Sequence, residues 1–255
     1  MQNSARLGIV AATEAEAAWV RRRLDRKVKT VSADGVLWHG VLLDLQVTLL
    51  RCGLGPDRAA AGLHWLIRQC RLWGVLSVGF AGGLKSHLAT GDAVLATCIR
   101  ATDSGARCIT PAAEWAQHAA AAASRAGLVQ HQGMLLSSPS LVPQSIDKQE
   151  LGRQSGAVAV DMESHCLGCL AAAYHLPFAT MRTIFDTSHD SLELPVSRFT
   201  TVDGRLNLSG VLGYVVQHPR ALTRFPSLWY KSRVAGRHLD IWLFHFLTLL
   251  SQKRL

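Results

Sequence analysis

The sequence predicts a single α/β domain with a central mixed β-sheet flanked by helices, followed by a C-terminal amphipathic helical tail. Short apolar runs suited to buried strands alternate with helical segments along roughly the first 190 residues, which is the pattern of an α/β sheet. The chain has 255 residues, 49% of them hydrophobic, so it can bury a large core and is not disordered. We therefore assign residues 1–215 to one domain and residues 216–255 to the tail.

The first half of the domain begins with a short apolar strand over residues 7–12. Thr13 can cap the helix that follows, because its hydroxyl can accept from the first turn. Residues 36–41 and 45–51 form a predicted hairpin. The next expected elements are a helix over 57–72, a strand over 75–80 and a strand over 93–99.

The second half centres on residues 157–190, a predicted strand, helix and strand with acidic residues at both junctions. The helix spans Met162 to Tyr174, and Pro177 ends it. Open α/β sheets bind ligands at the carboxyl ends of their strands, so these junctions are expected to meet in one crevice. The other expected elements are an alanine-rich helix over 112–126, a strand over 129–137, an exposed helix over 146–154 and a helix over 207–217.

The formal charge of +9 is concentrated in the tail. Residues 216–255 hold seven Lys and Arg against one Asp, a net charge of +6. This basic segment is also aromatic, which favours an anionic membrane surface over a nucleic acid. One helical face carries Leu239, Trp242, Leu243, Phe246, Leu249 and Leu250. We expect this face to lie in the headgroup plane; the alternative is that it packs on the body or on a dimer partner.

Six cysteines lack the spacing of a disulfide framework, so reduced thiols in a cytoplasmic protein are expected. No run reaches the roughly 20 apolar residues that span a bilayer. Cys166 and Cys169 form a CxxC pair inside a helix with no second pair, so helix packing is favoured over a zinc or redox site. The histidines show no ligand spacing, and we predict no metal.

Two glycine motifs each follow a strand, Gly53-x-Gly55 and Gly79-x-x-Gly82-Gly83. Glycine lets the backbone approach a ligand, although both could be tight turns without one. Glu16, Glu163 and Asp186 also come soon after strands. A buried carboxyl such as Asp186 can be held protonated by desolvation and act as a general acid, although one acid alone could be a cap or turn residue.

These motifs together resemble the nucleoside phosphorylase superfamily, most closely its methylthioadenosine/S-adenosylhomocysteine nucleosidase branch. The resemblance covers about residues 6–190 and implies cleavage of the N-glycosidic bond of an adenosine derivative without a cofactor. It implies that Asp186 protonates adenine at N7, Glu16 activates water and Glu163 binds the ribose hydroxyls. The implied substrate-binding residues are Met162, Leu141, Val142, Phe80, Ala81, Gly82, Phe185 and Asp161. A homodimer is also implied.

Two positions depart from that branch, because Phe80 and Phe185 stand where serine is usual. The tail motifs over residues 203–222 are similar to the hopanoid-associated nucleosidase/phosphorylase subgroup. That similarity implies adenosylhopane as the substrate and ribosylhopane as a product, at the inner face of the cytoplasmic membrane. The alternatives are phosphorolysis with phosphate as co-substrate, in which Arg51 could contact the phosphate, and a soluble methylthioadenosine or purine nucleosidase. A non-catalytic nucleoside-binding module is a further alternative.

Overall fold

The computed structural model describes residues 4–103, 105, 107–192 and 225–253. The helix expected over 207–217 and the tail motifs over 203–222 lie outside these residues. In chain order the elements are β1 Arg6–Ala11, α1 Glu14–Arg21, β2 Asp25–Ser32, β3 Gly35–Leu42, β4 Leu45–Arg51, α2 Pro56–Gln69, β5 Leu72–Gly83, β6 Ala93–Ala101, α3 Ala113–Arg125, β7 Gln130–Ser137, α4 Ser145–Ser155, β8 Ala159–Asp161, α5 Ser164–Ala173, β9 Phe178–Asp186 and α8 Phe225–Gln252.

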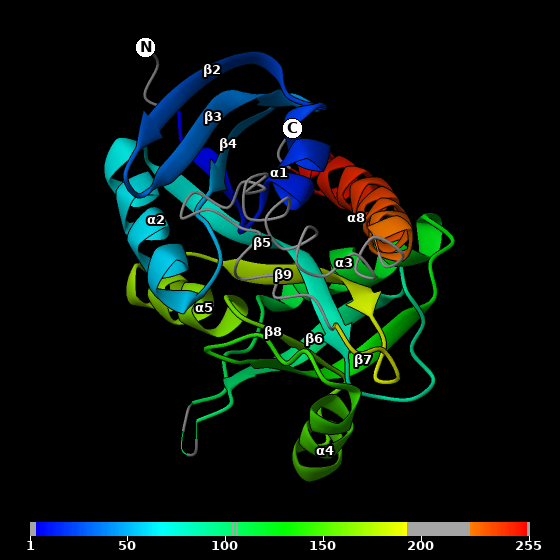
Figure 1. Cartoon of the computed structure of the whole chain (residues 1–255). Helices are drawn as coiled ribbons and strands as arrows, with labels where there is room; N and C mark the ends of the chain where they lie inside the picture. Colours follow the sequence, from blue (N-terminus) through cyan, green and yellow to red (C-terminus); the bar gives the residue numbers. More distant parts are fainter. Residues whose placement is uncertain (1–3, 104, 106, 193–224, 254–255) are drawn as a thin grey trace.

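The strands form one mixed nine-stranded sheet in the order β2-β3-β4-β1-β5-β8-β7-β6-β9. Strand β5 also pairs with β9 in parallel, so the far part of the sheet closes on itself. Helices α1, α3 and α8 lie on one face of the sheet, and α2 and α5 lie on the other (Figure 1). The predicted fold class, a mixed sheet flanked by helices, is confirmed.

Local sequence explains most of these elements. Thr13 and Glu16 form a capping box at the start of α1, in which the side chain of each residue accepts from the backbone N–H of the other. The hairpin β3–β4 turns at Leu43 and Asp44, both with positive φ. Strand β2 was not predicted, because it is charged and exposed along its whole length and so lacks an apolar periodicity.

Helix α8 does not follow the membrane expectation. Its apolar face is buried between α1, α3 and the sheet: Leu239, Trp242, Leu243 and Phe246 are each at most 1% exposed. The prediction that this face lies in lipid headgroups is wrong, and the alternative of packing on the body is confirmed. Burying each such side chain stabilises the fold by about 1.5–3 kcal/mol relative to leaving it in water.

Helix α8 also forms ion pairs with the body. Asp240 is buried and accepts from Arg22 and Arg23 of the α1 end, each at 2.5 Å. Lys231 pairs with Asp190 at 2.7 Å, and Lys253 pairs with Glu114 at 2.9 Å. Helix α8 is therefore held against the α/β body by ion pairs as well as by apolar contacts. None of the described helices combines the length and apolar character that crossing a membrane requires.

The expectation of six reduced cysteines is also wrong for one pair. Cys98 on β6 and Cys108 form a disulfide, with their Cα atoms 5.7 Å apart. Cys166 and Cys169 are free thiols on α5, as expected for helix packing. Burial raises the pKa of Cys166 to about 12, so this thiol is not a reactive thiolate at neutral pH.

Candidate active site

The second glycine motif is not a turn. Strand β5 continues through it to Gly83, and Gly82 and Gly83 pair with Val160 and Ala159 of β8. The predicted strand over 75–80 was too short at its carboxyl end, because glycines are typical of turns but here continue the strand. Instead the glycines leave room for acids. A Cβ on Gly79 would lie 2.5 Å from Oε1 of Glu16, and one on Gly82 would lie 3.5 Å from Oδ1 of Asp186.

Glu16 is held at one end of this glycine-rich stretch of β5. Its Oε2 accepts from the backbone N–H groups of Ala12 and Thr13 at 3.1 and 2.8 Å. Its Oε1 accepts from the N–H of Phe80 at 2.8 Å. The carboxylate thereby links the start of α1 to β5, and only 6% of Glu16 is exposed. Its position is set by both the capping box and the sheet.

Glu163 is the second buried carboxyl at this site. Its Oε1 accepts from the N–H of Gly55, 2.8 Å away, so the first glycine motif serves it directly. Gly55 has a φ of +97° there, a conformation that favours glycine. Burial, with Asp161 and Glu16 nearby, raises the pKa of Glu163 to about 8, while the Gly55 N–H and Arg182 oppose the shift. Glu163 is therefore mostly protonated at neutral pH in the ligand-free protein.

Asp161 does not face the site as a substrate-binding group. Its carboxylate accepts from Ser137 at 2.6 Å and from Arg182 Nε at 2.8 Å, and it also binds the Ser164 hydroxyl. These partners fix the β8–α5 junction that carries Glu163. The buried Arg182, which also donates to Ser77 at 2.8 Å, was not singled out by sequence reasoning. A lone arginine inside the apolar run 178–185 was the available signal, since buried charge needs a partner.

Asp186 lies at the carboxyl end of β9 and is 5% exposed. Its Oδ2 is bound by Nζ of Lys148, which is fully buried on α4. Burial raises the pKa of Asp186, and the Lys148 charge opposes that rise. Sequence reasoning missed Lys148 because α4 was expected to be an exposed helix. The polar composition of α4 gave no signal that one lysine points inward.

Phe80 and Phe185 stack on each other, with ring centroids 5.8 Å apart. Each is only partly buried, and Phe185 directly precedes Asp186 in β9. Ala81 lies between β8 and β9 in the core and is 4% exposed, so its side chain belongs to the packing of the sheet. The two phenylalanines that depart from the usual serines therefore meet in space.

Three further predicted residues have different surroundings. The methyl group of Met162 approaches the Gly55 turn, 3.9 Å from where a Cβ would stand. Val142 packs against a small cluster containing Leu84 and Val160, and Leu141 is 44% exposed. Contacts of Leu141 and Val142 with a base remain predictions.

Arg51, considered for phosphate, is almost fully buried at the end of β4 and pairs with Glu14. Its Nε and Nη2 have no hydrogen-bond partner among the described residues. Within the same residues, no three His, Cys, Asp or Glu side chains gather where a metal ion could bind.

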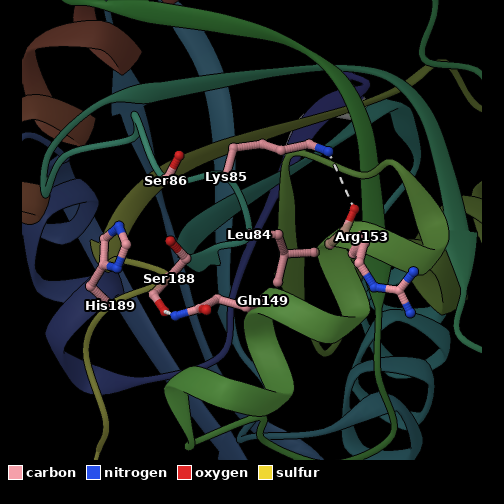
Figure 2. Close-up of a pocket in the computed structure, with 8 residues that line it drawn as sticks. Leu84, Lys85, Ser86, Gln149, Arg153, Ser188 and His189 are labelled. Carbon is pink, nitrogen blue, oxygen red and sulfur yellow. Dashed lines mark hydrogen bonds between the residues drawn. The ribbon is translucent and has the colours of Figure 1, made fainter.

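A separate hollow of about 260 Å³ lies between α4, the end of β5 and the segment after β9. Figure 2 shows Gln149 of α4 reaching toward Ser188, with Lys85 and Ser86 on the opposite side. The three carboxyl groups do not line it. At this hollow α4 is linked to the segment after β9, because Gln149 Nε2 donates to the carbonyl of Ser188 at 3.1 Å.

Comparison with known proteins gives the family. A profile of the Phosphorylase superfamily matches residues 6–212. The chain belongs to this superfamily. Among its relatives, a 5′-methylthioadenosine/S-adenosylhomocysteine nucleosidase from a strain of Exiguobacterium is 27% identical over 210 residues, covering 76% of this chain and 90% of that protein.

Superfamily members of known structure share the fold at lower identity. A 5′-methylthioadenosine/S-adenosylhomocysteine nucleosidase from Neisseria meningitidis, in complex with methylthio-immucillin-A, is 18% identical with a TM-score of 0.74; the match covers 96% of this chain and 99% of that one. The corresponding protein from Colwellia psychrerythraea 34H, in complex with adenine, is 18% identical with a TM-score of 0.76, over 96% and 95% of the two chains.

Proposed function

We propose that the protein is a nucleosidase that cleaves the N-glycosidic bond of an adenosine derivative and releases adenine. The observation that supports this most is that three buried carboxyl groups stand beside glycine residues. Glu16 lies against Gly79 and Asp186 lies near Gly82 of β5, and Glu163 accepts from the N–H of Gly55. A base and a ribose can approach the backbone closely at such glycines. The relative of 27% identity, whose name is that of such a nucleosidase, agrees with this proposal.

The chemistry assigns a different role to each acid. Adenine leaves poorly as an anion, so Asp186 protonates it at N7, and general-acid help of this kind is typically worth about 10²–10⁴-fold. Glu16 orients and deprotonates the attacking water. Glu163 binds the ribose hydroxyls, Met162 packs under the sugar, and nearby carboxylates stabilise the oxocarbenium-like transition state.

The proposed substrate is adenosylhopane, which would leave ribosylhopane. Support comes from the Phe80–Phe185 stack, which puts two aromatic rings where two small hydroxyl groups are usual. A large apolar 5′-substituent gains contact area there, whereas a small thioether uses little of it. A methylthioadenosine or general purine nucleosidase is the alternative. A module that only binds nucleosides is disfavoured, because binding alone gives no use for an acid at N7.

Phosphorolysis is the second candidate reaction, and one observation favours it. The buried guanidinium of Arg51 has two N–H-bearing atoms without a hydrogen-bond partner in the described part of the chain, and a phosphate oxygen could accept from them. Glu14 already occupies the same guanidinium, so we propose hydrolysis first.

The test is to incubate the purified full chain with adenosylhopane, methylthioadenosine and adenosine, with and without phosphate, and to measure adenine. We expect adenine from adenosylhopane without phosphate. Strict dependence on phosphate would replace hydrolysis by phosphorolysis. Faster release from methylthioadenosine would replace the substrate, and no adenine from any of the three would overturn the proposed function.

We also propose peripheral membrane association through exposed side chains in the first turns of α8, because its apolar face is buried in the body. Trp229 and Tyr230 are 64% and 63% exposed, and Arg233 lies over the Trp229 ring. Exposed aromatic and basic side chains together suit an anionic interface. Replacing both aromatic residues by serine should reduce flotation with anionic liposomes. Unchanged flotation would contradict this mode of association. The homodimer remains a prediction.

A further inference from the structure

The buried ion pair between Lys148 and Asp186 has no place in the chemistry described above. Lys148 is 0% exposed, which is rare for lysine because moving an ammonium group out of water costs several kcal/mol unless it is well paired. Its Nζ donates to Oδ2 of Asp186 and, at 2.8 Å, to the carbonyl of Thr187. Both acceptors belong to the end of β9, so one lysine holds the proposed acid and the backbone just after it.

The geometry leaves the other carboxyl oxygen available. Both carboxyl oxygens of Asp186 lie near Gly82, with Oδ1 at 3.5 Å and Oδ2 at 3.7 Å from where a Cβ would stand. Lys148 approaches from α4 and donates to Oδ2. A base that approaches Gly82 would therefore find Oδ1 as the oxygen that Lys148 does not hold.

We infer that Lys148 is a positioning residue of the proposed site: its ammonium group holds Oδ2 of Asp186, leaves Oδ1 for the substrate, and controls the charge of that carboxyl group. This inference rests on the proposed function for its catalytic meaning. The contact itself, and its effect on the charge of Asp186, do not depend on the substrate.

The electrostatic surroundings of Asp186 make the effect testable. The charged groups that act on it are Lys148 from α4, Asp190 from the segment after β9, and Lys231 from α8. Asp190 and Lys231 pair with each other at 2.7 Å, so their effects on Asp186 oppose each other. Burial raises the pKa of Asp186, and Lys148 is the main group that lowers it. Without Lys148, Asp186 should keep its proton to higher pH.

The chain offers a matched control in the next residue. Gln149 also ties α4 to the segment after β9, through Ser188, but it carries no charge. Gln149→Ala removes a tie without changing the charge beside Asp186, whereas Lys148→Met removes both. Lys148→Arg keeps the charge. A purely structural role of Lys148 would make Lys148→Met and Gln149→Ala alike.

Two measurements on the full chain test the inference. The first is a ¹³C NMR titration of the Asp186 carboxyl carbon, assigned by its loss in Asp186→Asn. The second is the pH profile of kcat/KM for adenine release. In Lys148→Met we expect the titration midpoint and the alkaline limb of the profile to move up by at least one pH unit. Lys148→Arg and Gln149→Ala should stay within half a unit of wild type.

An unmoved midpoint in Lys148→Met would overturn the inference, whether or not the protein releases adenine. An active wild type with an unmoved midpoint is thus failure of this inference alone. An inactive wild type with a shifted midpoint is failure of the proposed function alone. If Lys148→Met does not fold, Lys148→Gln, which can still donate to Thr187, carries the same expectation.

Discussion

Two buried carboxyl groups of similar exposure, Glu163 and Asp186, are surrounded in opposite ways. Glu163 receives one backbone N–H, from Gly55, and has two other acids near it, so its pKa rises to about 8. Asp186 is in contact with the ammonium group of Lys148, which opposes the rise that burial causes. Burial raises both pKa values, and the difference lies in the partners: the acids near Glu163 add to the rise, whereas Lys148 opposes it at Asp186.

In the proposed reaction the two carboxyl groups therefore have different roles. Glu163, with a pKa of about 8, is mostly neutral at pH 7, so it can donate to a ribose oxygen as well as accept from one. Lys148 favours release of the Asp186 proton, because its charge stabilises the carboxylate left behind. A general acid must release its proton during the reaction.

The largest effect is expected for Asp186→Asn, which tests one side of this comparison. Asparagine keeps the shape but has no proton to transfer to N7. Adenine release should fall by about 10²–10⁴-fold with an unchanged circular dichroism spectrum. Near wild-type turnover would mean that the acid is misassigned.

Glu163→Gln tests the other side through stability. The folded pKa of Glu163 is about 8 and its ordinary value is 4.5. Folded protein therefore holds an extra proton between those values, and stability falls as the pH rises through that window. Each pKa unit is worth about 1.4 kcal/mol. Glutamine mimics the neutral acid, so the Tm of the variant should match wild type at pH 5 and exceed it by several degrees at pH 9. A difference in Tm that does not change with pH would contradict the raised pKa.

Phe185→Ser sharpens the comparison from the Asp186 side, because Phe185 directly precedes Asp186 in β9 and stacks on Phe80. Losing one aromatic contact should lower the preference for an apolar 5′-substituent by about tenfold, within the range typical of apolar pocket changes. The ratio of kcat/KM for adenosylhopane and methylthioadenosine measures this. An unchanged ratio would mean that the Phe80–Phe185 pair does not determine the preference for an apolar 5′-substituent.

The smallest effect is expected for Asp190→Asn. Asp190 raises the pKa of Asp186, and its loss also frees Lys231 to lower that pKa further. The alkaline limb of the pH profile should move down, by less than one unit. Movement upward would contradict the assigned signs of these charges.

The sequence was sufficient for the regular parts of the molecule. Alternating apolar runs predicted most of the strands. The acids that follow predicted strands are buried, with Glu16 and Asp186 next to glycines of β5, and their joint role in one site stays a prediction. What failed depended on long-range partners. Lys148 is buried because its ammonium group pairs with Asp186. Strand β2 forms because its backbone pairs with the edge of β3. The apolar face of α8 reads alike for lipid and for a protein groove, and only the tertiary structure separates them.

The most direct test of the central claim compares two leaving groups in Asp186→Asn. Adenine needs protonation at N7 to leave, whereas para-nitrophenolate leaves from a para-nitrophenyl riboside without it. We predict that Asp186→Asn loses at least about 10²-fold in kcat/KM on the adenosine substrate. On the nitrophenyl riboside the same variant should stay within about tenfold of wild type, because departure of para-nitrophenolate requires no general acid. Equal losses on both substrates would contradict the assignment of Asp186 as the acid that protonates the base.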